Sequence, residues 1–98
     1  MKRDQYYLMK LAEECSEVAQ RALKQVQFGK EEVQKGQDLT NGERLRLEIM
    51  DLLTVIDVLE SENHIPFMDF DLMKDHMTAK KYKLEKYMDY SRCLERVK

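Results

Sequence analysis

The chain has 98 residues, a length that fits one small domain with a modest core and leaves no room for a second catalytic domain. Hydrophobic residues make up 43% of the chain and charged residues 37%, with Gly 3 and Pro 1, which favours an all-α fold over a disordered chain or a turn-rich β protein. Lys and Arg number 17 against 19 Asp and Glu, and the formal net charge of -2 argues against nucleic acid as a partner.

The cysteines and the N-terminal residues indicate the cellular compartment that we expect for the protein. Cys15 and Cys93 show no spacing typical of a zinc site, so we expect two free thiols in a reducing compartment. The N-terminal residues lack the apolar core of a signal peptide, and no run approaches the roughly 18 apolar residues that a membrane span needs. We therefore expect a soluble, cytoplasmic protein with no membrane partner and a single domain over residues 1–98.

The first predicted helix begins near Tyr6. Its apolar residues recur in steps of three and four, which places them on one stripe: Leu8, Leu11, Cys15, Val18, Ala22 and Val26. The helix ends near Gly29 or continues, frayed, to Gly36. After a loop, Thr40-Asn41-Gly42-Glu43 has the form of a capping box, which predicts the start of a second helix.

The second helix is expected over about Glu43 to Glu62. Its apolar residues project on every side, and this pattern predicts a helix that is buried all round. The segment Asn63–Pro66 is expected to be a turn, with Pro66 opening the next helix. The remainder, Phe67 to Val97, is either one long helix or two helices separated near Thr78.

Acidic residues inside the second helix are the unusual feature of the sequence. Glu48 and Asp51 stand three apart, with Asp57 further along, and a carboxylate taken out of water needs a cation, a basic side chain or a proton. Glu14 and Glu17 form a matching pair in the first helix, beside Glu13. Two antiparallel helices would bring the pairs together as a four-carboxylate cage of the oxygen-rich kind that suits Mg²⁺ or Mn²⁺.

Simple ion pairing is the alternative for both acidic groups. Glu13, Glu14 and Glu17 would then form a solvated face that pairs with three nearby cations, Lys10, Arg21 and Lys24. Glu48 and Asp51 would pair with Arg44 or with a lysine of the last helix. The sequence leaves both alternatives open.

The two acidic blocks also carry a family resemblance. Glu13-Glu14-Cys15-Ser16-Glu17 followed by Glu48-Ile49-Met50-Asp51 resembles the EExxE…ExxD signature of the MazG-like, all-α nucleoside triphosphate pyrophosphohydrolases. The likeness covers about Tyr7 to Asn63, and the segment from Lys30 to Asn41 is on the long side for the family. The resemblance implies helical hairpins that form a homodimer or homotetramer and complete a four-helix bundle.

The resemblance also implies an activity and a set of site residues. The reaction would be Mg²⁺-dependent hydrolysis of NTPs or dNTPs to the monophosphate and pyrophosphate, in nucleotide-pool house-cleaning or precursor control. By position, Mg²⁺ or Mn²⁺ would be held by four carboxylates, Glu14, Glu17, Glu48 and Asp51. Glu13 would orient or deprotonate the attacking water.

Lysines near the end of the chain are candidates for contacts with the substrate phosphates. The family often places basic residues there, which points to Lys80, Lys83 and Lys86, although a solvated face paired with Glu85 and Asp89 is the alternative. Two other functions stay open. One is a non-catalytic helical oligomerisation module in which the acids pair with basic residues, and the other is the related phosphoribosyl-ATP pyrophosphohydrolase.

Overall fold

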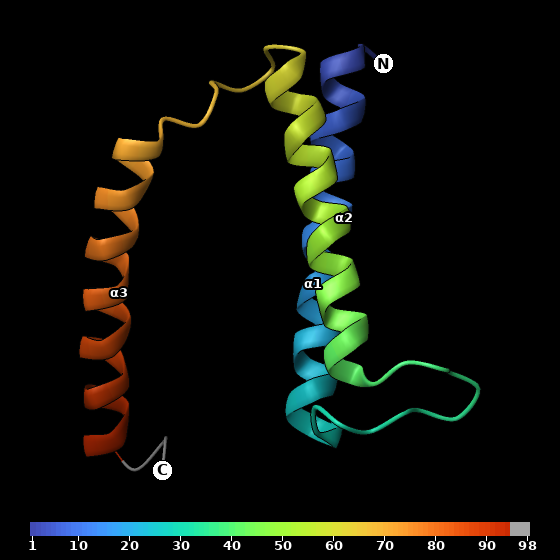
Figure 1. Cartoon of the computed structure of the whole chain (residues 1–98), viewed down its shortest axis with the longest axis vertical. Coiled ribbons are helices and arrows are strands. Elements are labelled where there is room, and N and C mark those ends of the chain that lie inside the picture. Colours follow the sequence, from blue (N-terminus) through green and yellow to red (C-terminus); the bar gives the residue numbers. More distant parts are fainter. Residues whose placement is uncertain (95–98) are drawn as a thin grey trace. The chain divides into compact units, whose positions relative to one another are not determined.

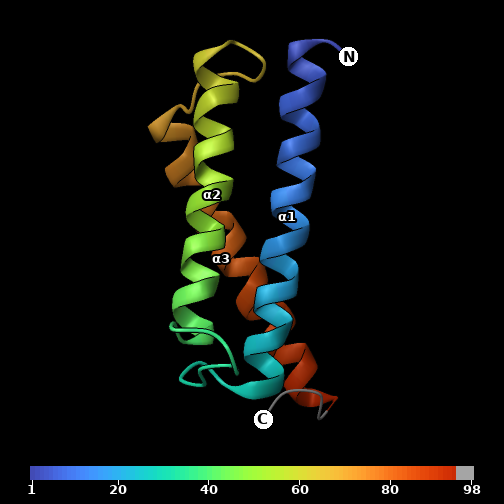
Figure 2. The ribbon, with the colours of Figure 1, turned by 90° about the vertical axis from the view of Figure 1, so that its right-hand side faces the viewer.

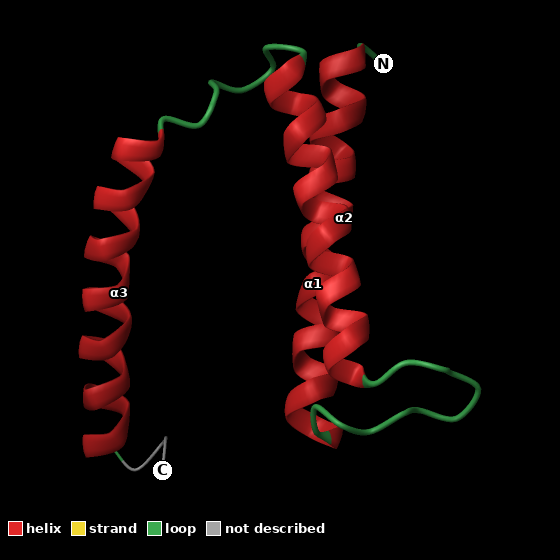
Figure 3. Cartoon of the chain, viewed as in Figure 1, coloured by secondary structure: helices red, strands yellow, loops and turns green. Residues whose placement is uncertain are grey.

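The computed structural model describes residues 1–94, which form three α-helices: α1 (Arg3–Phe28), α2 (Asn41–Ser61) and α3 (Phe70–Cys93). No strand occurs in this range, so the predicted all-α class is confirmed (Figure 3). The chain divides into two compact units, one with α1 and α2 and ending at Pro66, the other beginning at Phe67 and containing α3 (Figure 1). None of the described helices combines the length and apolarity that a bilayer crossing requires.

Helices α1 and α2 form an antiparallel hairpin and pack along their lengths (Figure 2). Helix α1 ends at Phe28, because Gly29 adopts a φ of 92°, a left-handed conformation that glycine accepts readily. The Gly29 N–H still donates to the Gln25 carbonyl at 2.9 Å. Of the two predicted ends of this helix, the structure has the one at Gly29.

The start of α2 is fixed by the predicted capping box. The Thr40 hydroxyl accepts from the Glu43 N–H and the Glu43 carboxylate accepts from the Thr40 N–H, each at 3.1 Å. The adjacent Asn41 is only 1% exposed, and its amide donates to the Gly29 carbonyl at 2.9 Å. The Asn41 bond thereby connects the start of α2 to the residue that follows α1.

The far end of the hairpin is held by an ion pair. The Arg3 guanidinium donates through Nε and Nη2 to the two carboxylate oxygens of Glu62, at 2.5 and 2.8 Å. This two-point contact with Arg3 lowers the pKa of Glu62, and a further contact with His64 acts in the same direction. The start of α1 is thereby joined to the residue that follows α2.

The expectation that α2 is buried on every side is wrong for this chain. Leu59 and Asn41 are its only buried residues, whereas Leu47, Met50 and Leu53 are 47%, 51% and 54% exposed. Within the hairpin, α1 covers one face of α2 and leaves the other open. Asp51 and Asp57 are consequently exposed, so water solvates them and no compensating partner is required.

The entry into α3 also differs from the prediction. Pro66 does not open the helix, because residues 66–69 are irregular and the cap is Asp69, whose carboxylate accepts from the N–H groups of Asp71 and Leu72. Phe70–Cys93 is one continuous helix. Thr78 lies within it and donates its hydroxyl to the Lys74 carbonyl at 2.9 Å. The predicted stretch after Leu94 lies outside the described residues.

Candidate metal centre

Three of the predicted ligands meet between α1 and α2. Glu14 and Glu17 come from α1 and Glu48 from α2, and each offers one carboxylate oxygen within 4.8 Å of the others. Glu14 and Glu17 are close because residues three apart share a helix face, and the antiparallel packing brings Glu48 opposite them. We call these three residues the carboxylate cluster.

Two oxygens of the carboxylate cluster are buried without a partner. Oε2 of Glu14 and Oε2 of Glu48 are shielded from solvent, and neither has a hydrogen-bond partner. Burial raises the pKa of the Glu14 carboxyl, and the nearby charges of Glu17 and Asp51 raise it further. The pKa of Glu48 is raised by burial first and then by its contact with Glu17. The cluster therefore lacks a positive charge that would stabilise its ionised form.

Within the hairpin of α1 and α2, the clustered acids form none of the predicted ion pairs. Among residues 1–94, Glu14, Glu17 and Glu48 form no ion pair, although Glu13 does pair with Lys10 at 3.0 Å. Arg44, proposed as a partner for the acids of α2, donates instead to the side chain of Gln34 in the loop at 2.8 Å. The predicted solvent-exposed, ion-paired environment is thus found for Glu13 but not for the acids of the carboxylate cluster.

Asp51 and Glu13 lie beside the carboxylate cluster. Asp51 is exposed and is not one of the three mutually close residues, but its charge contributes to the raised pKa values of Glu14 and Glu48. Glu13 is exposed on α1 next to Glu14. The structure thus brings Glu14, Glu17 and Glu48 together, with Asp51 near enough to act on them electrostatically.

The donor set fits a hard divalent cation. All three side chains of the cluster offer carboxylate oxygens, the ligands that Mg²⁺ and Mn²⁺ prefer. The two buried oxygens without partners are the atoms that a cation would satisfy. Residues and geometry are therefore compatible with the predicted metal.

The candidate phosphate-binding lysines lie in the other compact unit. Lys80, Lys83 and Lys86 are exposed on α3, and their i, i+3 spacing places neighbours along one side of that helix. Their contact with substrate stays a prediction.

Two further residues of the hairpin seam are Arg21, predicted only as an ion-pair partner of the acids, and Gln25, which the sequence did not single out. Nη1 of Arg21 and Oε1 of Gln25 are buried and have no hydrogen-bond partner. Both follow Glu17 in steps of four, so the helical period was the available signal. Their lack of partners depends on how α2 packs against α1, and the spacing of residues in the sequence does not contain this information.

Comparison of the chain with models of protein families, with curated proteins and with solved structures finds no match. The carboxylate cluster and its surroundings are therefore the basis for assigning a function to this chain.

Proposed function

We propose that this protein is a Mg²⁺-dependent nucleoside triphosphate pyrophosphohydrolase, which hydrolyses NTPs or dNTPs to the monophosphate and pyrophosphate. The observation that carries the proposal is the carboxylate cluster with two buried, unpartnered oxygens. Buried carboxylates without a partner destabilise the hairpin when they ionise. Their presence is therefore better explained by cation binding than by a contribution to folding.

Each residue of the centre has a distinct part in this proposal. Glu14, Glu17 and Glu48 hold the cation, and Asp51 adds negative charge at the exposed edge. A bound Mg²⁺ or Mn²⁺ neutralises triphosphate charge and favours attack by water. Glu13 is exposed beside the cluster, where its carboxylate orients the attacking water or accepts its proton. Lys80, Lys83 and Lys86 supply cationic contacts to the phosphates.

The proposal includes assembly into a homodimer or homotetramer through the outer face of α2. Met50 and Leu53 project from this face three residues apart and are about half exposed. Leu59 is the only fully buried hydrophobic side chain among the described residues, so a single chain has a small core. A second copy of the same face buries these residues by mutual packing. Sedimentation of Leu53→Lys should show a smaller species than the wild type, with Gln27→Lys as control.

The same exposed face supports a second candidate, a non-catalytic helical oligomerisation module. Such a protein would assemble through α2 without needing the carboxylate cluster to bind metal. Its thermal stability would not respond to Mg²⁺ or Mn²⁺, and it would hydrolyse no nucleotide.

The test is a screen of all NTPs and dNTPs, with phosphoribosyl-ATP added, in Mg²⁺ and in Mn²⁺, scoring pyrophosphate against phosphate. The proposal expects pyrophosphate from at least one nucleotide. Glu48→Gln should reduce the rate by at least about two orders of magnitude, because it removes a carboxylate that holds the metal. Asp57→Asn, which alters an exposed acid of the same helix, is the matched control. Undiminished turnover in Glu48→Gln would contradict the proposal.

A further inference from the structure

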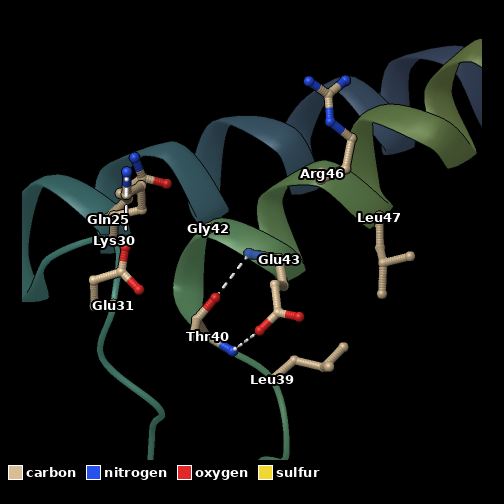
Figure 4. A pocket seen from close by; sticks show the side chains of 9 residues that line it. All are labelled: Gln25, Lys30, Glu31, Leu39, Thr40, Gly42, Glu43, Arg46 and Leu47. Carbon is tan, nitrogen blue, oxygen red and sulfur yellow. Dashed lines mark hydrogen bonds and ion pairs between the residues drawn. The ribbon is translucent and has the colours of Figure 1, made fainter.

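A pocket opens at the loop end of the hairpin, between the end of α1, the loop and the first turns of α2 (Figure 4). Its volume of about 680 Å³ lies in the range of small-molecule sites. Leu39 and Leu47 are its apolar lining side chains, with Glu43 drawn close to Leu39, while Gln25, Lys30 and Glu31 line the other side of the view (Figure 4). The pocket therefore combines two leucine side chains with polar and charged groups.

The pocket lies on the same side of the hairpin as the carboxylate cluster. On α1, Glu17, Arg21 and Gln25 follow one another in steps of four and share a face. On α2, Leu47 of the pocket and Asp51 beside the cluster are also four residues apart. Since a helix rises 1.5 Å per residue, Gln25 lies about 12 Å along α1 from Glu17. One extended ligand can therefore reach from the cluster into the pocket.

The shared face of α1 carries two buried polar atoms in need of partners. Nη1 of Arg21, a donor, and Oε1 of Gln25, an acceptor, both lack hydrogen bonds. Buried groups of this kind usually have a hydrogen-bond partner, which these two atoms lack. Phosphate oxygens suit a guanidinium donor, and an N–H group of a nucleobase suits an amide oxygen.

We propose that the pocket receives the nucleoside of the substrate, with Arg21 contacting its phosphates and Gln25 accepting a hydrogen bond from its base. The inference rests on the proposed pyrophosphohydrolase function and extends it by naming the residues that position the substrate. Along α1 the order is then metal ligands, phosphate contact and base contact. Leu39 and Leu47 provide the apolar surface for the base or sugar.

The test compares steady-state kinetics of Gln25→Leu and Arg21→Gln with the wild type on the best nucleotide of the screen. Each variant loses one hydrogen bond to the substrate, so KM should rise about tenfold while kcat changes much less. Gln20→Leu, the same change at an exposed position of α1, should leave KM unaltered. Mg²⁺-induced thermal stabilisation should persist in Gln25→Leu, since this variant keeps the carboxylate cluster.

Direct binding provides a second readout. Titration of the metal-free protein with the nucleoside of the best nucleotide should shift the NMR signals of the Leu39 and Leu47 methyl groups and of the Gln25 amide. Unchanged KM in both variants, or no shifts at these residues, would overturn the pocket assignment while nucleotide hydrolysis by the wild type still upheld the proposed function. Failure of the wild type to hydrolyse any nucleotide would instead refute the proposed function.

Discussion

The seam between α1 and α2 has two halves of different character. The half near Arg3 and Glu62 is packed by aliphatic side chains, including Leu11, Leu52 and the fully buried Leu59. The rest of the seam, from Glu14 and Glu48 at its middle to the loop, contains all five of the buried, unpartnered polar side chains found among residues 1–94: Glu14, Arg21, Gln25, Asn41 and Glu48. We call them the apolar half and the polar half.

The difference shows where stability and function reside in the hairpin. Apolar burial stabilises the fold, whereas a buried polar group without a partner costs about 1–3 kcal/mol. The polar half therefore lowers the stability of the metal-free, ligand-free chain. Its atoms are complementary in kind to a cation, a phosphate and a base, so the proposed ligands account for residues that folding alone disfavours.

The largest effect is expected from damage to the apolar half. Leu59→Ala removes the one hydrophobic side chain among residues 1–94 that is 0% exposed and leaves a cavity in the hairpin. The free energy of unfolding should fall by about 2–4 kcal/mol, measured by urea denaturation. Leu53→Ala, at a side chain that is 54% exposed, is the control and should cost much less if the chain is monomeric under the assay conditions. Equal losses would contradict the assignment of the core to the apolar half.

A change in the polar half should have the opposite sign. The raised pKa values of Glu48 and Glu14 mean that the metal-free fold is favoured while these groups are protonated and loses stability as pH rises through those values. Glu48→Gln removes one of these charges, so metal-free protein above neutral pH should melt about 2–5 °C higher than the wild type. A lower melting temperature by circular dichroism would show that Glu48 stabilises the fold instead.

The smallest effect is expected at the exposed end of the apolar half. The lowered pKa of Glu62 contributes stability above its unfolded-state pKa, and this is lost as pH falls through the folded-state value. Arg3→Ala should therefore reduce the melting temperature slightly at neutral pH and have no effect once Glu62 is protonated. A pH-independent difference between Arg3→Ala and the wild type would mean that this ion pair is not the cause.

Local signals in the sequence predicted much of this fold. Gly29 and the Thr40 capping box gave the limits of the loop correctly, because such signals depend on a few neighbouring residues. The helical period predicted that the acids of the two helices meet, and Glu14, Glu17 and Glu48 do so. Pro66 was misread because the carboxylate of Asp69 provides the helix cap further along the chain.

Burial was predicted less well than helix limits. An apolar pattern all round α2 indicates what the helix can bury, but a single hairpin supplies only one covering helix, and Met50 and Leu53 remain exposed. The unpartnered atoms of Arg21 and Gln25 likewise arise from packing between α1 and α2. Such features depend on contacts between distant residues, and hydrophobic periodicity does not encode which polar atoms find partners.

The central claim is that the carboxylate cluster holds a divalent cation. Isothermal titration calorimetry of the full chain with Mn²⁺, above the raised pKa values of Glu14 and Glu48, tests this claim most directly. The wild type and Asp57→Asn should show the same saturable binding, and Glu48→Gln should lose it. Binding that is absent from the wild type, or unchanged in Glu48→Gln, would contradict the account.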